Sequence, residues 1–103
     1  MIQHMVFLSL LPDADRAELD QVMAGLVGLI GQIDGFQAFS HGPNLDFEGK
    51  SQEAPYGFIC TFDSAAAVER YANDPGHKAL GGRLVALCGG ADRIKVYDLK
   101  VGG

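Results

Sequence analysis

The pattern of apolar and polar side chains begins with a strand that is apolar on both faces. From Ile2 to Leu10 the residues alternate in the period of a β-strand. One face carries His4, Val6, Leu8 and Leu10, and the other carries Gln3, Met5, Phe7 and Ser9. Because a sheet with one solvated face shows a cleaner alternation, we expect this strand to be covered from both sides.

An amphipathic helix is predicted next, over residues 16 to about 33. Asp15 and Glu18 have the spacing of an N-cap and its reciprocal acid, and Gly35 is a stop signal. Apolar residues recur at helical spacing between them: Leu19, Val22, Met23, Leu26, Ile30 and Ile33. Three glycines inside this helix, Gly25, Gly28 and Gly31, indicate either close packing of the helix on a sheet or space left for a ligand.

The rest of the chain predicts three more strands and a second helix in two parts. The strands are expected at Phe36 to His41, Tyr56 to Phe62 and Asp92 to Leu99. A polar loop from Gly42 to Pro55 joins the first two of them. A helix capped by Asp63 or Ser64 runs to about Asn73, is broken by Pro75 and resumes from about His77 to Leu87.

The order βαββαβ predicts an α+β, ferredoxin-like split βαβ fold, with an antiparallel sheet and helices on one face only. The other face of that sheet is then bare, although its strands are apolar on both sides. A second copy of the chain is the natural cover, so we expect a homodimer.

Composition narrows the class of partner. The length of 103 residues predicts one domain, spanning 1–103, and 48% hydrophobic residues argue against disorder. A formal net charge of −5 disfavours nucleic acid and anionic membrane surfaces. The chain has neither a long apolar run nor a basic signal-peptide start, so we expect a cytoplasmic protein with no membrane partner.

Metal and nucleotide sites have little support in the sequence. Cys60 and Cys88 lie 28 residues apart in apolar surroundings and are expected to be reduced core residues. The histidines at positions 4, 41 and 77 have no zinc-site spacing, His41 is expected to be exposed, and no glycine-rich phosphate motif occurs. We therefore expect no metal and no cofactor. The acidic loop residues Asp46, Glu48 and Glu53 either hold a cation at a dimer edge or are simply solvated.

Three residues are the candidates for chemistry. His4 lies on an apolar strand face, where it is either a buried structural histidine or part of a cavity wall. His77 is expected in the first turn of a helix, where it either packs against Tyr71 or is kept neutral by the helix dipole and able to accept a proton. Tyr71 either fills the core or offers its hydroxyl to a carbonyl or an imidazole.

Several motifs in order resemble the stress-responsive dimeric α/β-barrel (Dabb) family over nearly the whole chain. They are His4-Met5-Val6, Leu10-Leu11-Pro12, Ile33-Asp34-Gly35, Gly42-Pro43-Asn44, Phe62-Asp63-Ser64 and the stretch Tyr71-Ala72-Asn73-Asp74-Pro75-Gly76-His77. The resemblance implies a monomer whose sheet pairs with that of its twin, and a hydrophobic cavity between each sheet and its helices. It also implies that His4 and His77 line that cavity.

The resemblance leaves the reaction open, because the family includes plant stress proteins as well as a polyketide cyclase. We expect a small apolar carbonyl or aromatic metabolite as ligand, with Val6, Leu8, Leu26 and Phe58 around it. Any catalysis would be cofactor-independent proton transfer by His4 and His77 assisted by Tyr71, as in a cyclase, isomerase, lyase or oxygenase. The cyclase also uses a tyrosine of its first helix, which the stretch Met23 to Val27 lacks. The alternative is a noncatalytic stress-responsive protein whose dimeric assembly is the function.

Overall fold

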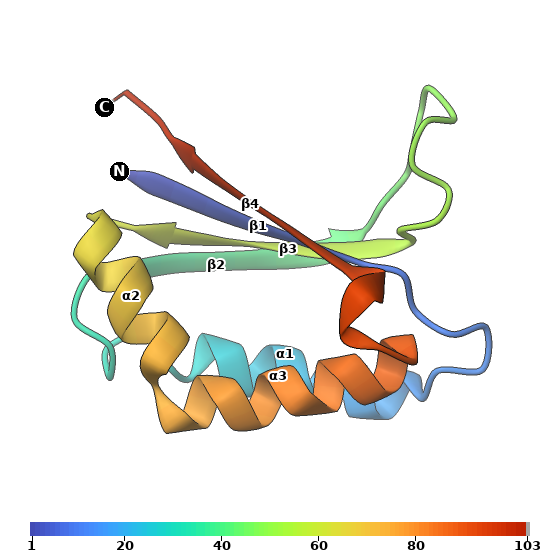
Figure 1. Ribbon diagram of the computed structural model, residues 1–103, viewed down its shortest axis with the longest axis horizontal. Coiled ribbons are helices and arrows are strands. Elements are labelled where there is room, and N and C mark those ends of the chain that lie inside the picture. The colour runs from blue at the N-terminus through green and yellow to red at the C-terminus, as the bar shows by residue number, and fades with distance from the viewer. Residues whose placement is uncertain (103) are drawn as a thin grey trace.

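The fold is one four-stranded antiparallel sheet with all of its helices on one side (Figure 1). A computed structural model describes residues 1–102. The elements are, in order, β1 (Ile2–Leu8), α1 (Arg16–Val27), β2 (Phe36–Pro43), β3 (Tyr56–Phe62), α2 (Ala65–Asn73), α3 (Pro75–Cys88), the 3-10 turn η1 (Ala91–Arg93) and β4 (Ile94–Lys100). This order confirms the predicted ferredoxin-like α+β fold.

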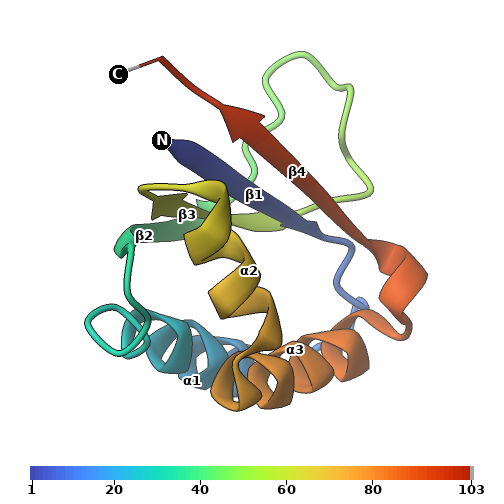
Figure 2. The ribbon, with the colours of Figure 1, turned by 60° about the vertical axis from the view of Figure 1, so that its left-hand side comes forward.

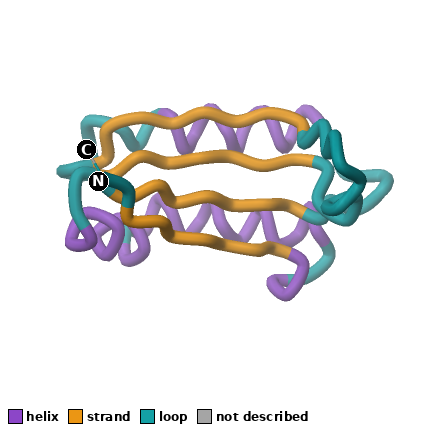
Figure 3. The backbone as a smooth tube through the Cα atoms, turned by 90° about the horizontal axis from the view of Figure 1, so that it is seen from above, coloured by secondary structure: helices purple, strands orange, loops and turns teal. Residues whose placement is uncertain are grey.

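The sheet has the strand order β2-β3-β1-β4, so β1 is central and β4 is an edge strand. Seen from above, the four strands form one layer and the helices form a second layer beneath it (Figure 3). In the antiparallel register His4 of β1 lies opposite Cys60 of β3 on one side and opposite Asp98 of β4 on the other. These three side chains therefore share the face of the sheet that is turned toward the helices.

The opposite face of the sheet is uncovered and apolar, as the two-sided pattern of β1 predicted. Met5 pairs in register with Ile59 of β3 and with Tyr97 of β4, so all three project from this face. Ile59, Tyr97 and Leu99 are 40%, 53% and 49% exposed. The loop between β2 and β3 rises on this same side, away from the helices (Figures 1 and 2).

The first helix is shorter than predicted: α1 ends at Val27, and the expected continuation to residue 33 is wrong. Gly28 is the C-cap, and its backbone N–H donates to the carbonyl of Ala24. Gly31 has a φ of 88°, which a helix does not allow. Apolar residues nevertheless recur at helical spacing beyond the end of α1, because Ile33 in the following turn is also buried against the core.

A glycine is needed at position 25, but not for the reason expected from the sequence. A Cβ at this position would lie 2.8 Å from a methyl carbon of Leu80, which belongs to α3. The close approach is therefore between two helices, and the expected packing of this glycine on the sheet is wrong. Gly28 and Gly31 lie outside the helix and need neither explanation.

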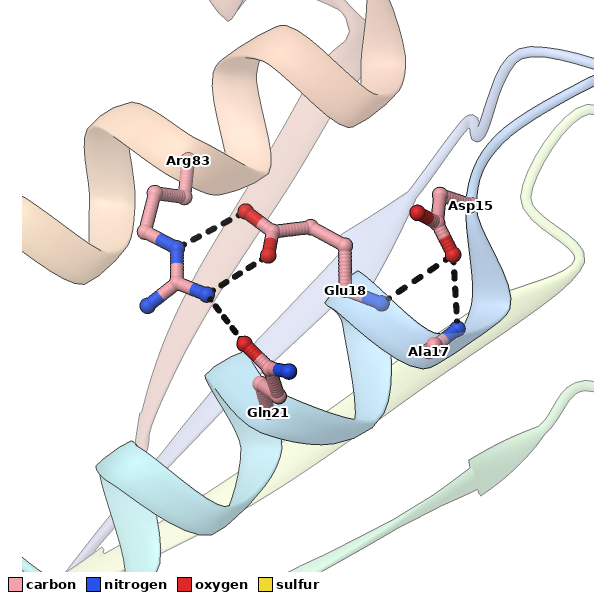
Figure 4. A network of polar contacts seen from close by, with 5 residues as sticks. All are labelled: Asp15, Ala17, Glu18, Gln21 and Arg83. Atoms are coloured by element: carbon pink, nitrogen blue, oxygen red, sulfur yellow. Dashed lines mark hydrogen bonds and ion pairs between the residues drawn. The ribbon is translucent and has the colours of Figure 1, made fainter.

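The capping box at the start of α1 forms only in part (Figure 4). Asp15 accepts hydrogen bonds from the backbone N–H groups of Ala17 and Glu18, as an N-cap should. The Glu18 carboxylate turns instead to Arg83 of α3, with N–O distances of 2.8 and 2.6 Å. This hydrogen bond lowers the pKa of Glu18 against the smaller opposing effect of burial, and it joins α1 to α3.

The remaining differences concern the residues at which elements begin or end. The strand β1 ends at Leu8, two residues earlier than expected, and β2 continues to Pro43. The helix α3 begins at Pro75, because the Asp74 side chain accepts from the His77 backbone N–H and a proline is tolerated in the first helical turn. The last strand begins at Ile94 because residues 91–93 form a 3-10 turn.

The buried core gathers between the sheet and the helices. The largest fully buried side chains are Tyr71 and Phe62, whose ring centroids are 5.1 Å apart. Cys60 and Cys88 are buried free thiols, as predicted. Within residues 1–102, no helix has the length and apolarity that a membrane span requires.

Candidate functional site

A cavity of about 340 Å³ lies between the helix-facing side of the sheet and α3. Within the helical layer α3 packs against α1, α2 and η1. Its walls come from β1, β3, β4, α2, α3 and η1: His4, Val6, Phe58, Tyr71, His77, Gly81, Leu84, Val85, Ala91, Ile94 and Val96. The lining is apolar apart from two imidazoles and one phenol, which is typical of small-molecule sites.

The structure brings together the three residues that the sequence singled out for chemistry. His4 from β1, Tyr71 from α2 and His77 from α3 all line this cavity. The ring centroid of Tyr71 is 5.6 Å from that of His4 and 3.9 Å from that of His77. Tyr71 therefore packs against both imidazoles.

The four residues expected to surround the ligand divide into two pairs. Val6 and Phe58 line the cavity. Leu8 and Leu26 do not line it, and their side chains are enclosed in the packed core. The reason for Leu26 is that α1 contributes no residue to the lining, since the cavity lies on the α3 side of the helical layer.

His4 is held by a carboxylate that the sequence analysis did not select. The distance from its Nδ1 to Oδ1 of Asp98 is 2.6 Å. The Asp98 side chain is half-exposed, whereas that of His4 is mostly buried. A carboxylate on Nδ1 favours the tautomer that carries a proton there, which leaves Nε2 with its lone pair free.

A sequence signal for Asp98 existed. In the last strand Ile94, Val96 and Asp98 occupy alternate positions and so share a face. A carboxylate at the end of an apolar strand face needs a polar partner, which a neighbouring strand can provide. His4 had already been predicted to lie on such a face. What the sequence could not supply was the register that sets these two residues opposite each other.

Tyr71 is almost completely buried, with an exposed fraction of 1%. Its hydroxyl oxygen lies 3.8 Å from Sγ of Cys60, from which it accepts a weak hydrogen bond. Burial raises the pKa of the Tyr71 hydroxyl strongly and raises the pKa of the Cys60 thiol to about 12. Both groups therefore stay protonated at neutral pH, and Tyr71 can act as a donor but not as a base.

His77 occupies the first turn of α3, where the sequence predicted it. Its backbone N–H donates to Oδ2 of Asp74 at 3.0 Å, while its side-chain Nδ1 is buried without a hydrogen-bond partner. Burial and, next, the nearby charge of His4 lower the pKa of His77, whereas the backbone of Ala72 and, less strongly, the charge of Asp74 act in the opposite direction. The imidazole is therefore neutral at pH 7.

The remaining candidates lie outside the cavity. His41 is exposed, as expected, and its Nδ1 hydrogen-bonds the hydroxyl of Tyr56. Asp46 uses its carboxylate inside the loop, where it accepts from the backbone N–H groups of Lys50 and Ser51. Across residues 1–102, no group of three or more His, Cys, Asp or Glu side chains is placed to hold a metal ion.

Three comparisons place the chain among known proteins. The family model described as Stress responsive A/B Barrel Domain (Dabb) matches residues 2–101. The stress-response A/B barrel domain-containing protein HS1 of Arabidopsis thaliana is 24% identical over 99 residues, which is 96% of this chain and 88% of that protein.

Two solved structures have the same fold. A dimeric ferredoxin-like protein of unknown function from Jannaschia sp. CCS1 is 46% identical, with a TM-score of 0.91 over 97% of this chain and 98% of that one. The hydroxynitrile lyase of Passiflora edulis is 16% identical, with a TM-score of 0.80 over 98% of this chain and 93% of that one. At the identity of the second, the likeness concerns the fold alone.

Proposed function

The chain belongs to the stress-responsive A/B barrel (Dabb) family, and from this premise we propose that it binds a small neutral metabolite in the cavity under α3. The ligand would have an apolar or aromatic body and a carbonyl group. Each subunit of a homodimer would bind one molecule. The observation that carries the proposal is the meeting of His4, Tyr71 and His77, from three different elements, at one apolar cavity.

The size and charge of the cavity support this class of ligand. A volume of about 340 Å³ falls within the roughly 300–1,000 Å³ of small-molecule sites. None of the described residues that line it is Lys or Arg, and Asp98 next to His4 adds negative charge. A carboxylate or phosphate would find no cation there, so the site favours a neutral molecule whose oxygen meets an imidazole.

If the ligand is turned over, the geometry favours proton transfer beside its carbonyl. His4, oriented by Asp98, would take a proton from the carbon next to the carbonyl through Nε2. Neutral His77 would donate a hydrogen bond from its ring N–H to the enolate oxygen that forms. Return of the proton from His4 to a different carbon of an extended enolate gives an isomer. Attack of the enolate carbon on a second carbonyl forms a carbon–carbon bond and an alkoxide, and transfer of the proton from His4 to that alkoxide gives the aldol product.

The uncovered sheet face supports the homodimer. Its apolar side chains, including Met5, Ile59 and Tyr97, are accessible in the single chain. A 46% identical protein with the same fold is described as dimeric. We expect light scattering at micromolar concentration to give the mass of a dimer, and Ile59→Asp to give a monomer because a buried unpaired carboxylate is costly. A monomeric mass for the unmodified chain would contradict the assembly.

Binding is tested by thermal unfolding with neutral aromatic ketones, beginning with acetophenone and 2-acetylnaphthalene. A ligand at about 100 times its Kd stabilises the folded state by about 2.7 kcal/mol, so a specific probe raises the melting temperature measurably. Replacement of His77 by Gln should reduce that increase, and replacement of exposed His41 by Gln should leave it unchanged. Equal shifts in all three proteins would place the binding elsewhere and overturn the proposal.

A second function is favoured by one observation, the extent of the apolar sheet face. In this case the protein is noncatalytic and its assembly in stress is the function, in keeping with the name of its Arabidopsis relative. The two proposals predict different behaviour of Ile59→Asp and His77→Gln. Loss of cellular stress tolerance with Ile59→Asp but not with His77→Gln would favour assembly, and the reverse would favour the cavity.

A further inference from the structure

The helix α3 contains two adjacent glycines in its middle turn, Gly81 and Gly82. Glycine is a poor residue for a helix interior, because it loses more backbone freedom on folding than alanine does. Two consecutive glycines in a helix of 14 residues therefore need a reason that outweighs this cost.

The usual reasons for a helical glycine do not apply to Gly81. Its backbone is not among the positive-φ positions, so the conformation does not require glycine. A Cβ built on Gly81 would have no heavy atom within 4 Å beyond its chain neighbours and the nearby backbone of its own helix. At Gly25 of α1, by contrast, a Cβ would lie 2.8 Å from Leu80, which accounts for that glycine by packing alone.

What distinguishes Gly81 is its place in the cavity wall. Gly81 lines the cavity, one helical turn after His77, whereas its exposed neighbour Gly82 does not. Side chains of a helix lean toward its N-terminus, so a side chain at position 81 would cover the turn that carries His77. The space beside the His77 ring is therefore open because position 81 has no side chain.

We propose that Gly81 is a specificity-determining residue, which keeps the cavity open beside His77 for the planar ring of a neutral aromatic carbonyl compound. The inference rests on the proposed function and adds a size limit to it. With glycine at this position a ring can lie along the helix backbone while its carbonyl oxygen reaches the imidazole of His77. Any larger residue fills the same space and selects for smaller ligands.

Gly81 and Gly82 form a matched pair for the test. Leucine and alanine are good helix formers, and neither position has a neighbour with which a Cβ would collide. We expect Gly81→Leu and Gly82→Leu to fold as well as the unmodified chain, as judged by circular dichroism and melting temperature. The two alanine variants should melt at or above the temperature of the unmodified chain.

The measurement is titration calorimetry with 2-acetylnaphthalene and, as a smaller probe, acetophenone. Gly81→Leu should weaken binding of 2-acetylnaphthalene by more than about tenfold, and Gly82→Leu should change it by less than about twofold. Gly81→Ala should weaken the two-ring probe more than the one-ring probe. This dependence on ligand size is the signature that general destabilisation of α3 would not produce.

The outcomes separate the two proposals. If the unmodified chain binds neither probe, the proposed function fails and the role of Gly81 fails with it. If the unmodified chain binds both and Gly81→Leu binds them equally well, or if Gly82→Leu is equally impaired, the role of Gly81 alone is overturned. Should Gly81→Leu not fold, the alanine pair gives the same comparison with a smaller expected difference.

Discussion

The helices α1 and α3 lie side by side under the sheet, but they differ in how the space between helix and sheet is filled (Figure 2). On the α1 side, here called the packed half, the helix contacts β2 and its buried side chains fill the space to the sheet. On the α3 side, here called the hollow half, the helix also buries side chains, Leu84, Leu87 and Cys88, but the cavity lies between it and the sheet. Both halves contribute to one core, but the cavity with its two imidazoles lies on the α3 side alone.

The glycines of the two helices show the same contrast. Gly25 of α1 lets the side chain of Leu80 approach, so the absence of a side chain there is used for packing. Gly81 of α3 is approached by no other residue, so the absence of a side chain there leaves the cavity open. A glycine in a helix therefore indicates a ligand site only when nothing else occupies the space that it provides.

The largest expected effect separates the halves by stability. Leu26→Ala in the packed half should reduce the free energy of unfolding by about 3–4 kcal/mol, because its side chain is fully enclosed. Leu84→Ala, the same change beside the cavity, should cost only about 2 kcal/mol, because fewer contacts are lost there. Urea denaturation measures both values. Equal losses would mean that the α3 side is packed as tightly as the α1 side.

A smaller effect is expected from Asp98→Asn, which tests whether this residue positions His4. Because Asp98 is half-exposed, the free energy of unfolding should fall by less than about 1 kcal/mol. The imidazole of His4 should nevertheless lose its preference for the tautomer protonated on Nδ1, as measured by its ¹⁵N chemical shifts. Asp92→Asn is the control, and an unchanged tautomer in Asp98→Asn would show that Asp98 does not orient the ring.

The smallest expected effect is a dependence of stability on pH that originates in the hollow half. The pKa of His77 is lowered in the folded protein below its ordinary value of 6.5, so the unfolded chain binds the proton more readily. The contribution of His77 to stability is therefore complete above pH 6.5 and is lost as the pH falls below that value. Melting curves between pH 5 and pH 8 should show a smaller decline for His77→Gln, and an identical decline would contradict a neutral buried ring.

Local patterns in the sequence predicted most of the fold. Alternation in β1 and β3, the cap at Asp15 and the breaker at Pro75 placed the elements in the right order, because each is a property of neighbouring residues. The end of α1 was missed because Ile30 and Ile33 pack against the core from a turn yet continue the helical spacing. The spacing of apolar residues indicates which residues are buried, but it does not indicate the hydrogen bonds that define where a helix ends.

The site was predicted only in part, for a related reason. His4, Tyr71 and His77 were selected by residue type, by position and by a family resemblance, and they lie together in the structure. Asp98 was missed because its partnership depends on strand register across 94 residues of chain. Leu8 and Leu26 were misplaced because an apolar pattern identifies the inner side of an element but does not tell a filled space from an empty one.

The most direct test of the account uses the three histidines, two in the cavity and one outside it. Imidazole resonances of His4, His41 and His77 would be followed by NMR while acetophenone is added. If the ligand binds in the hollow half, the resonances of His4 and His77 should shift with the same dependence on ligand concentration, while those of His41 should not change. Unchanged resonances of His4 and His77, or equal shifts in all three, would contradict it.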